Sequence, residues 1–82
     1  MGLNVNKIIE LEDNSKYLLV KKTMYQGSKY YQAFKVDKNN NIDESDITIF
    51  KESMSGMEIF VTRVLSNDEL YQTLNRIFDA QL

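Results

Sequence analysis

Apolar and polar residues alternate over much of the chain before residue 65, as they do in strands with one buried face and one wet face. Clusters of polar residues interrupt this alternation as turn signals, and the chain has no proline. The pattern predicts five short strands, at residues 7–11, 16–25, 29–36, 47–52 and 57–64. Turn signals between successive strands favour an antiparallel meander.

The same alternation predicts the register of the hairpin formed by the second and third strands. A three-residue loop at residues 26–28 aligns the apolar side chains of one face in pairs. These pairs are Met24 with Tyr30, Val20 with Phe34, and Leu18 with Val36. A two-residue loop shifts every pair and mixes the faces. We therefore predict a three-residue loop with Gly27 in a left-handed conformation.

This register turns the other face of the hairpin toward water. That face carries tyrosines interleaved with lysines, and its candidate surface residues are Tyr17, Leu19, Lys21, Tyr25, Lys29, Tyr31 and Lys35. One helix covers only one face of a sheet, so this Tyr/Lys face stays open unless a partner covers it. We predict that it is the surface that contacts a partner.

The spacing of apolar residues becomes helical near the C-terminus. Ser66 and Glu69 match a capping box at the start of a helix. The apolar positions that follow have helical spacing: Leu70, Leu74, Ile77 and Phe78. The predicted fold is therefore α+β, a five-stranded antiparallel meander with one C-terminal helix packed on one face.

Composition removes most catalytic chemistry. The chain has 82 residues, which suffices for one small domain, and it contains no cysteine, histidine or tryptophan. Disulfides, thiolates and imidazole bases are therefore excluded. The carboxylate groups at residues 10–13 and 43–46 lie in or beside predicted turns, where water keeps them ordinary acids. We predict a protein that is not an enzyme and binds no cofactor.

The polar stretch at residues 37–46 resembles the opening of a calcium loop. Asp37, Asn39 and Asn41 supply oxygen atoms at the first, third and fifth positions. Ile42 then stands where the loop needs glycine, and Thr48 stands where it needs a bidentate glutamate. We therefore predict a solvated hairpin loop and no metal site, which a calcium titration can check.

The charge and hydropathy of the chain narrow the classes of partner. The net charge is −2, and no apolar run is long enough for a signal peptide or a membrane span. We predict a cytoplasmic protein-interaction or regulatory module without a membrane partner. The partner is left open, and a homodimer is one of the alternatives. Small cysteine-free regulators are also common in phages and mobile elements, so such an origin stays open.

Nucleic-acid binding through the Tyr/Lys face is the alternative function. Tyrosine rings can stack on bases while lysine ammonium groups contact phosphates. The acidic pI of about 5.0 argues against this alternative.

Several segments resemble a small bacterial family called domain of unknown function 1292. The similar segments are residues 9–13, 17–20, 25–31, 58–64 and 67–70. The resemblance extends from Lys7 to Phe78 and implies a meander-plus-helix fold. It implies no activity and transfers no functional residue.

Overall fold

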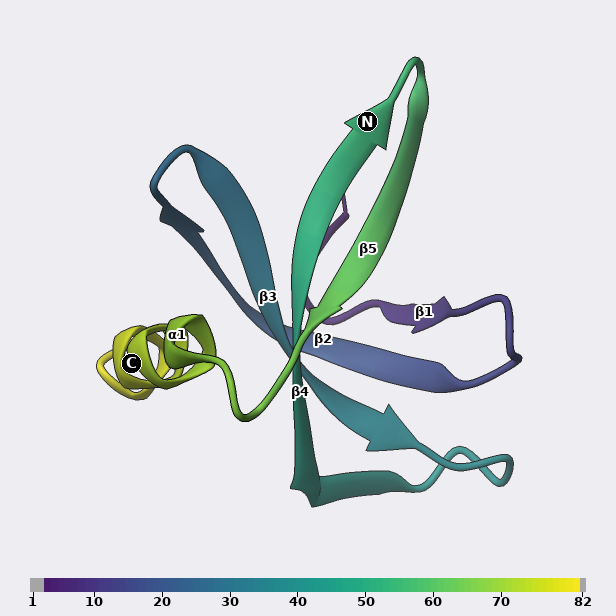
Figure 1. Ribbon diagram of the computed structural model, residues 1–82. Coiled ribbons are helices and arrows are strands. Elements are labelled where there is room, and N and C mark those ends of the chain that lie inside the picture. The colour runs from purple at the N-terminus through teal and green to yellow at the C-terminus, as the bar shows by residue number, and fades with distance from the viewer. Residues whose placement is uncertain (1–2, 82) are drawn as a thin grey trace.

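The computed structural model describes residues 3–81 and has five strands in one antiparallel sheet, followed by one helix. The strand order is β1-β2-β3-β4-β5 (Figure 1). The elements are β1 (Ile8–Glu10), β2 (Lys16–Tyr25), β3 (Ser28–Val36), β4 (Ile42–Ser55), β5 (Glu58–Val64) and α1 (Glu69–Asp79). The predicted α+β meander with a C-terminal helix is confirmed.

Hydrophobic side chains form a separate core on each face of this sheet. One face holds five buried residues that we call the inner core: Tyr17, Leu19, Tyr31, Ala33 and Phe50. Ile9 of β1 and Val61 of β5 both pack against it, since the sheet is strongly twisted and curled (Figure 1). The other face holds the helix core, formed by sheet and helix together: Tyr30, Ile49, Leu74 and Phe78.

The hairpin of β2 and β3 has a two-residue loop, so the predicted three-residue loop is wrong. Tyr25 pairs with Ser28, which leaves Gln26 and Gly27 as the loop. Their φ angles are 49° and 82°. Two positive φ angles are the mark of a type I′ turn, whose twist matches that of the flanking strands. The predicted left-handed conformation of Gly27 is confirmed.

A β-bulge in β2 changes the face to which the following side chains point. The register shifts between Leu19, which pairs with Ala33, and Lys21, which pairs with Gln32. Val20 is the extra residue, and an extra residue reverses the alternation beyond it. Leu19 therefore faces the inner core, whereas Thr23 pairs with Tyr30 on the helix side. The predicted assignment of one face to the whole strand is wrong.

Strand β4 begins at Ile42, five residues earlier than the predicted start at Ile47. The turn before it is compact, because the amide of Asp37 donates to the carbonyl of Asn41 at 2.9 Å. Phe34 pairs with Ile47 but Lys35 pairs with Asp43, so residues 44–46 bulge from the ladder. The polar composition of residues 42–46 therefore belongs to an exposed strand rather than to a loop.

Helix α1 begins two residues later than the predicted capping box implies. Asp68 is the N-cap, and its Oδ1 accepts from the amide of Leu70 at 3.0 Å. The predicted Ser66 cap is therefore wrong, although the predicted apolar face is confirmed by buried Leu74 and Phe78. At the other end, Lys21 Nζ donates to the carbonyl of Phe78 at 2.9 Å and ties the helix to β2.

Candidate functional site

The predicted Tyr/Lys face does not exist as an exposed surface. Tyr17 is 3% exposed, and Leu19 and Tyr31 are fully buried in the inner core. These three residues lie on the side that was expected to face water, but the curl of the sheet closes that side. Their assignment to an exposed partner surface is therefore wrong, and the rings of Tyr17 and Tyr31 are not accessible for stacking.

The four other predicted surface residues do not form one surface either. Lys21 and Tyr25 lie on the helix side, where Tyr25 packs against the helix core. Lys29 and Lys35 lie on the opposite side of the sheet. Lys29 Nζ is 3.8 Å from Glu52 Oε2, and Lys35 Nζ is 5.1 Å from the centre of the Tyr17 ring. The bulge at Val20 explains this division between the two faces.

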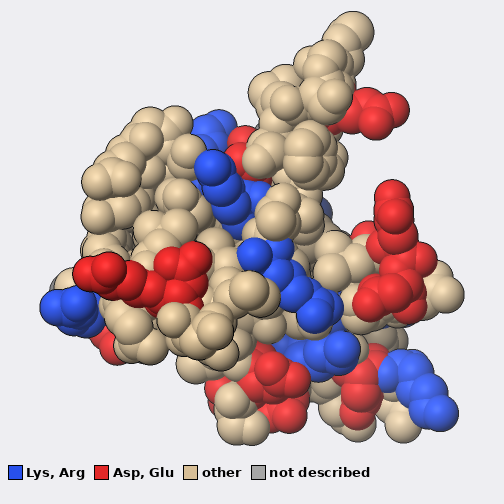
Figure 2. Space-filling model, viewed as in Figure 1, with Lys and Arg blue, Asp and Glu red and all other residues tan. Residues whose placement is uncertain are grey.

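A groove lies between the two edge strands of the sheet, β1 and β5. It has a volume of about 970 Å³ and opens to solvent. Within residues 3–81, β1 pairs only with β2 and β5 only with β4, so the curled sheet does not close into a barrel. Figure 2 shows a notch beside the projecting β4–β5 hairpin, with acidic side chains on both sides of it. This groove is the candidate site.

The floor of the groove is apolar and continuous with the inner core. Leu3, Ile9, Leu11 and Val61 line the groove and pack against the inner core, and each is half-buried. Ile59 of β5 also lines the groove and is half-buried. The sheet has therefore covered most of its inner core but has left one side of these side chains accessible.

The rim of the groove is acidic. Glu10, Glu12 and Asp13 line it from β1 and the following turn, and Glu58 lines it from β5. The hydroxyl and the amide of Ser15 donate to Asp13 and lower the pKa of its carboxyl, and Arg63 and Lys35 contribute more weakly. Asp13 is therefore ionised at neutral pH. Among the described residues that line the groove, these four acids outnumber the basic residues, of which there is one, Arg63.

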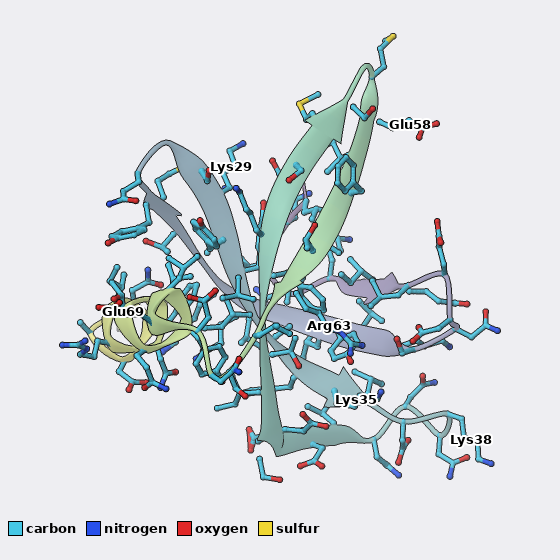
Figure 3. All side chains as sticks on the ribbon, in the orientation of Figure 1. Lys29, Lys35, Lys38, Glu58, Arg63 and Glu69 are labelled. Atoms are coloured by element: carbon cyan, nitrogen blue, oxygen red, sulfur yellow. The ribbon has the colours of Figure 1, made fainter. Side chains whose placement is uncertain are left out.

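Arg63 is fixed at one end of the groove. Its Nη2 donates to the hydroxyl of Tyr17 at 2.6 Å, and its guanidinium carbon lies 5.4 Å from the centre of the Tyr17 ring. The Tyr17 ring in turn packs edge-on against Phe50, with 5.0 Å between ring centres. In Figure 3, Arg63 lies near the middle of the sheet, whereas Glu58 lies toward the tip of the β4–β5 hairpin.

The Tyr31 hydroxyl lies between Glu52 and the N-terminal segment that lines the groove. Its hydroxyl donates to Glu52 Oε1 at 2.8 Å, and the carbonyl oxygen of Leu3 lies 3.3 Å from the same hydroxyl. Burial and the neighbouring Glu52 carboxylate raise the pKa of Tyr31 to about 12. The phenol therefore keeps its proton at neutral pH and serves as a structural donor.

The turn at Asp37, which resembles the opening of a calcium loop, offers no separate binding site among residues 3–81. Asp37 Oδ1 accepts from the amides of Asn39 and Asn41 at 2.8 and 2.9 Å, so this carboxylate stabilises its own turn. In the part of the chain that the structure describes, no three side chains of the metal-binding types converge. The same part has no helix that is both long and apolar enough to cross a membrane.

Comparison with known proteins adds no relative. No protein family, curated protein or solved structure matches this chain. The resemblance to the family called domain of unknown function 1292 therefore stays a prediction. The groove has to be interpreted from its own residues.

Sequence reasoning missed the groove, although one signal pointed to it. The first and last strands of a meander are its two edges, and an edge has unpaired backbone groups. Both predicted edge strands carry apolar residues next to acids, as in Ile9 with Glu10 and Ile59 with Glu58. The curl that brings these edges to one groove depends on tertiary packing, and a strand pattern does not contain it.

Proposed function

We propose that this chain is a protein-interaction module that binds an extended segment of a partner protein in the groove between β1 and β5. The observation that carries the proposal is an apolar-floored groove flanked by two strand edges that pair with no further strand within residues 3–81. Unpaired edge groups are a template for an added strand. Main-chain hydrogen bonds then supply affinity, and alternate side chains supply specificity.

The floor of the groove supports this mode of binding. Ile9, Ile59 and Val61 are half-buried, and a strand lying over them removes their remaining contact with water. Removal of apolar surface from water is worth about 25 cal/mol per Å². The inner core thereby gains the cover that the sheet alone does not provide.

We place no catalytic step in this function. The rim acids Glu10, Glu12, Asp13 and Glu58 are exposed to solvent. These groups suit charge recognition better than proton transfer or nucleophilic attack.

Nucleic-acid binding is less well supported by the same residues. Tyr17 and Tyr31 are buried, so neither ring is available to stack on a base. Figure 2 shows a band of lysine and arginine across this face, but acidic side chains lie along both sides of it. Lys29 contacts Glu52, and Lys35 and Arg63 contact Tyr17. We therefore favour a protein partner.

The test selects peptides from a random library against the full chain and maps the binders by amide chemical shifts. We expect shifts in β5 and β1. The variant Ile59→Lys, which places a charge in the floor, should abolish binding. The matched control is Ser66→Lys, which adds the same charge to an exposed position outside β5 and outside the groove. Binders that map to α1, or that bind Ile59→Lys unchanged, would contradict the proposal.

A further inference from the structure

We infer that the segment received by this groove is a strand in which apolar residues alternate with lysine or arginine. The inference rests on the proposed function, because it names the chemistry of the segment that the groove binds. Among the described residues, four acids line the groove, Glu10, Glu12, Asp13 and Glu58, and the basic residue in the lining is Arg63.

The two edges arrange apolar and acidic side chains on opposite sides of the sheet. Ile9 of β1 pairs with Tyr17, and Arg63 of β5 pairs with Phe50. Because Tyr17 and Phe50 belong to the inner core, Ile9 and Arg63 point to that face, and so does every second residue along each strand. Ile59 and Val61 share the face of Arg63, whereas Glu58 points to the opposite face. The same alternation places Glu10 on the face opposite to Ile9.

A strand inserted between these edges would have one side facing apolar residues and the other side facing acidic residues. Its inward side chains contact the apolar floor formed by Ile9, Ile59 and Val61. Its outward side chains point to the same face as Glu10 on one edge and Glu58 on the other. Lysine and arginine suit these outward positions, because their long stems can cover apolar surface while the charged end reaches a neighbouring carboxylate.

The rim carboxylates form no salt bridge with a basic residue within residues 3–81, although the charges of Arg63 and Lys35 act weakly on Asp13. The ion pair found within residues 3–81 joins Lys29 to Glu52, and neither residue lines the groove. Arg63, the basic residue in the lining, donates to the Tyr17 hydroxyl. The negative charge of the rim is therefore left for an incoming segment to neutralise.

A second copy of this chain is a weaker occupant by the same argument. Each chain carries a net charge of −2, and its own edge strand β5 carries one acid, Glu58, and one base, Arg63, so a second copy would bring no excess of positive charge to the rim. Like charges placed opposite each other across strands are destabilising. Pairing of β5 with β5 of a second copy remains an outcome that the test below detects.

The experiment compares three peptides of seven residues, the length of β5, on the full chain. Valine alternates with lysine in the first peptide, with glutamine in the second and with glutamate in the third. We expect shifts in β1 and β5 and a dissociation constant at least about tenfold lower for the lysine peptide than for the glutamate peptide. Raising the salt from about 0.05 M to about 0.5 M should reduce this ratio, because exposed charges are then screened.

Two double variants test whether the rim causes the preference. Glu10→Gln with Glu58→Gln should remove most of the discrimination between the lysine and glutamate peptides. The matched control is Glu44→Gln with Glu69→Gln, which removes the same charge from exposed positions outside the groove. This control should leave the discrimination unchanged.

The outcomes separate the inference from the proposed function. Equal binding of all three peptides in the groove overturns the basic preference and leaves the strand-binding function standing. Shifts that map away from β1 and β5, or no binding by any peptide, overturn both. Protection of β5 that grows with protein concentration in the absence of peptide assigns the groove to a second copy and overturns the inference.

Discussion

Val20 is the extra residue in β2, and it lies where the side chains of the strand pass from one face of the sheet to the other. Before it, Tyr17 and Leu19 point into the inner core. Beyond it, Lys21 points toward α1 and donates to the carbonyl of Phe78. One unpaired position thus lets a single strand contribute to two cores.

The burial of Leu19 leads to a prediction about stability. Leu19 is fully buried, whereas Leu65 is 64% exposed. Leu19→Ala should lower the free energy of unfolding by about 2–5 kcal/mol, because it leaves a cavity in the inner core. Leu65→Ala should change it by less than about 0.5 kcal/mol. Urea denaturation measures both, and similar values for the two variants would show that Leu19 is not a core residue.

The raised pKa of Tyr31 predicts a loss of stability at high pH. Because its folded pKa lies above the ordinary value of 10.0, at about 12, the stability it contributes is complete below pH 10 and is lost as the pH rises toward 12. Tyr31→Phe should remove this part of the decline. Denaturation of both proteins across this window tests the prediction, and parallel curves would contradict it.

The elements of this fold depend on short turns and on one helix end. The turn of β2 and β3 uses a glutamine with a φ of 49°, a conformation that most residues with a side chain avoid. The turn of β4 and β5 uses Gly56, with a φ of 64°, between the paired residues Ser55 and Glu58. Such turns set the register of each hairpin.

The turn conformation predicts opposite effects at two neighbouring positions. Gln26→Asn should stabilise the protein by up to about 1 kcal/mol, since asparagine adopts left-handed conformations more readily than glutamine. Gly27→Ala should destabilise it by about 1–2 kcal/mol, and the cost is conformational because an added Cβ meets no atom within 4 Å. Thermal melting of both variants measures these shifts, and the same sign for both would contradict the turn assignment.

Helix α1 is expected to be essential to the fold. Leu74 and Phe78 supply half of the buried residues of the helix core, and they cover Tyr30 and Ile49. A chain that ends at Leu65 should lose its cooperative thermal transition, because one face of the sheet then lies in water. A truncated chain that melts as cooperatively as the full chain would show that the inner core alone suffices.

At the scale of the whole molecule, strand order and fold class could be predicted because turn residues and apolar spacing are local signals. The bulge at Val20 could not, because its effect appears only when both faces of β2 have been packed. The early start of β4 was not predicted, because residues 42–46 are mostly polar, as in a loop, although they lie exposed in a strand. The groove could not be predicted from the sequence, because it exists only where the curl of the sheet brings β1 and β5 together.

Because the sheet curls, a single helix on one face does not leave the other face open to solvent. One face of the sheet is covered by α1, and the other is covered by the sheet itself except along the groove. The exposed partner surface is therefore expected at the two edges rather than on an open face.

Isotope-filtered nuclear Overhauser contacts between labelled protein and the unlabelled valine–lysine peptide test that claim most directly. We predict backbone contacts from the peptide to the Glu58–Val64 strand, together with side-chain contacts to Ile9 and Val61. Contacts confined to α1 or to the β2–β3 turn, with none along β5, would contradict it.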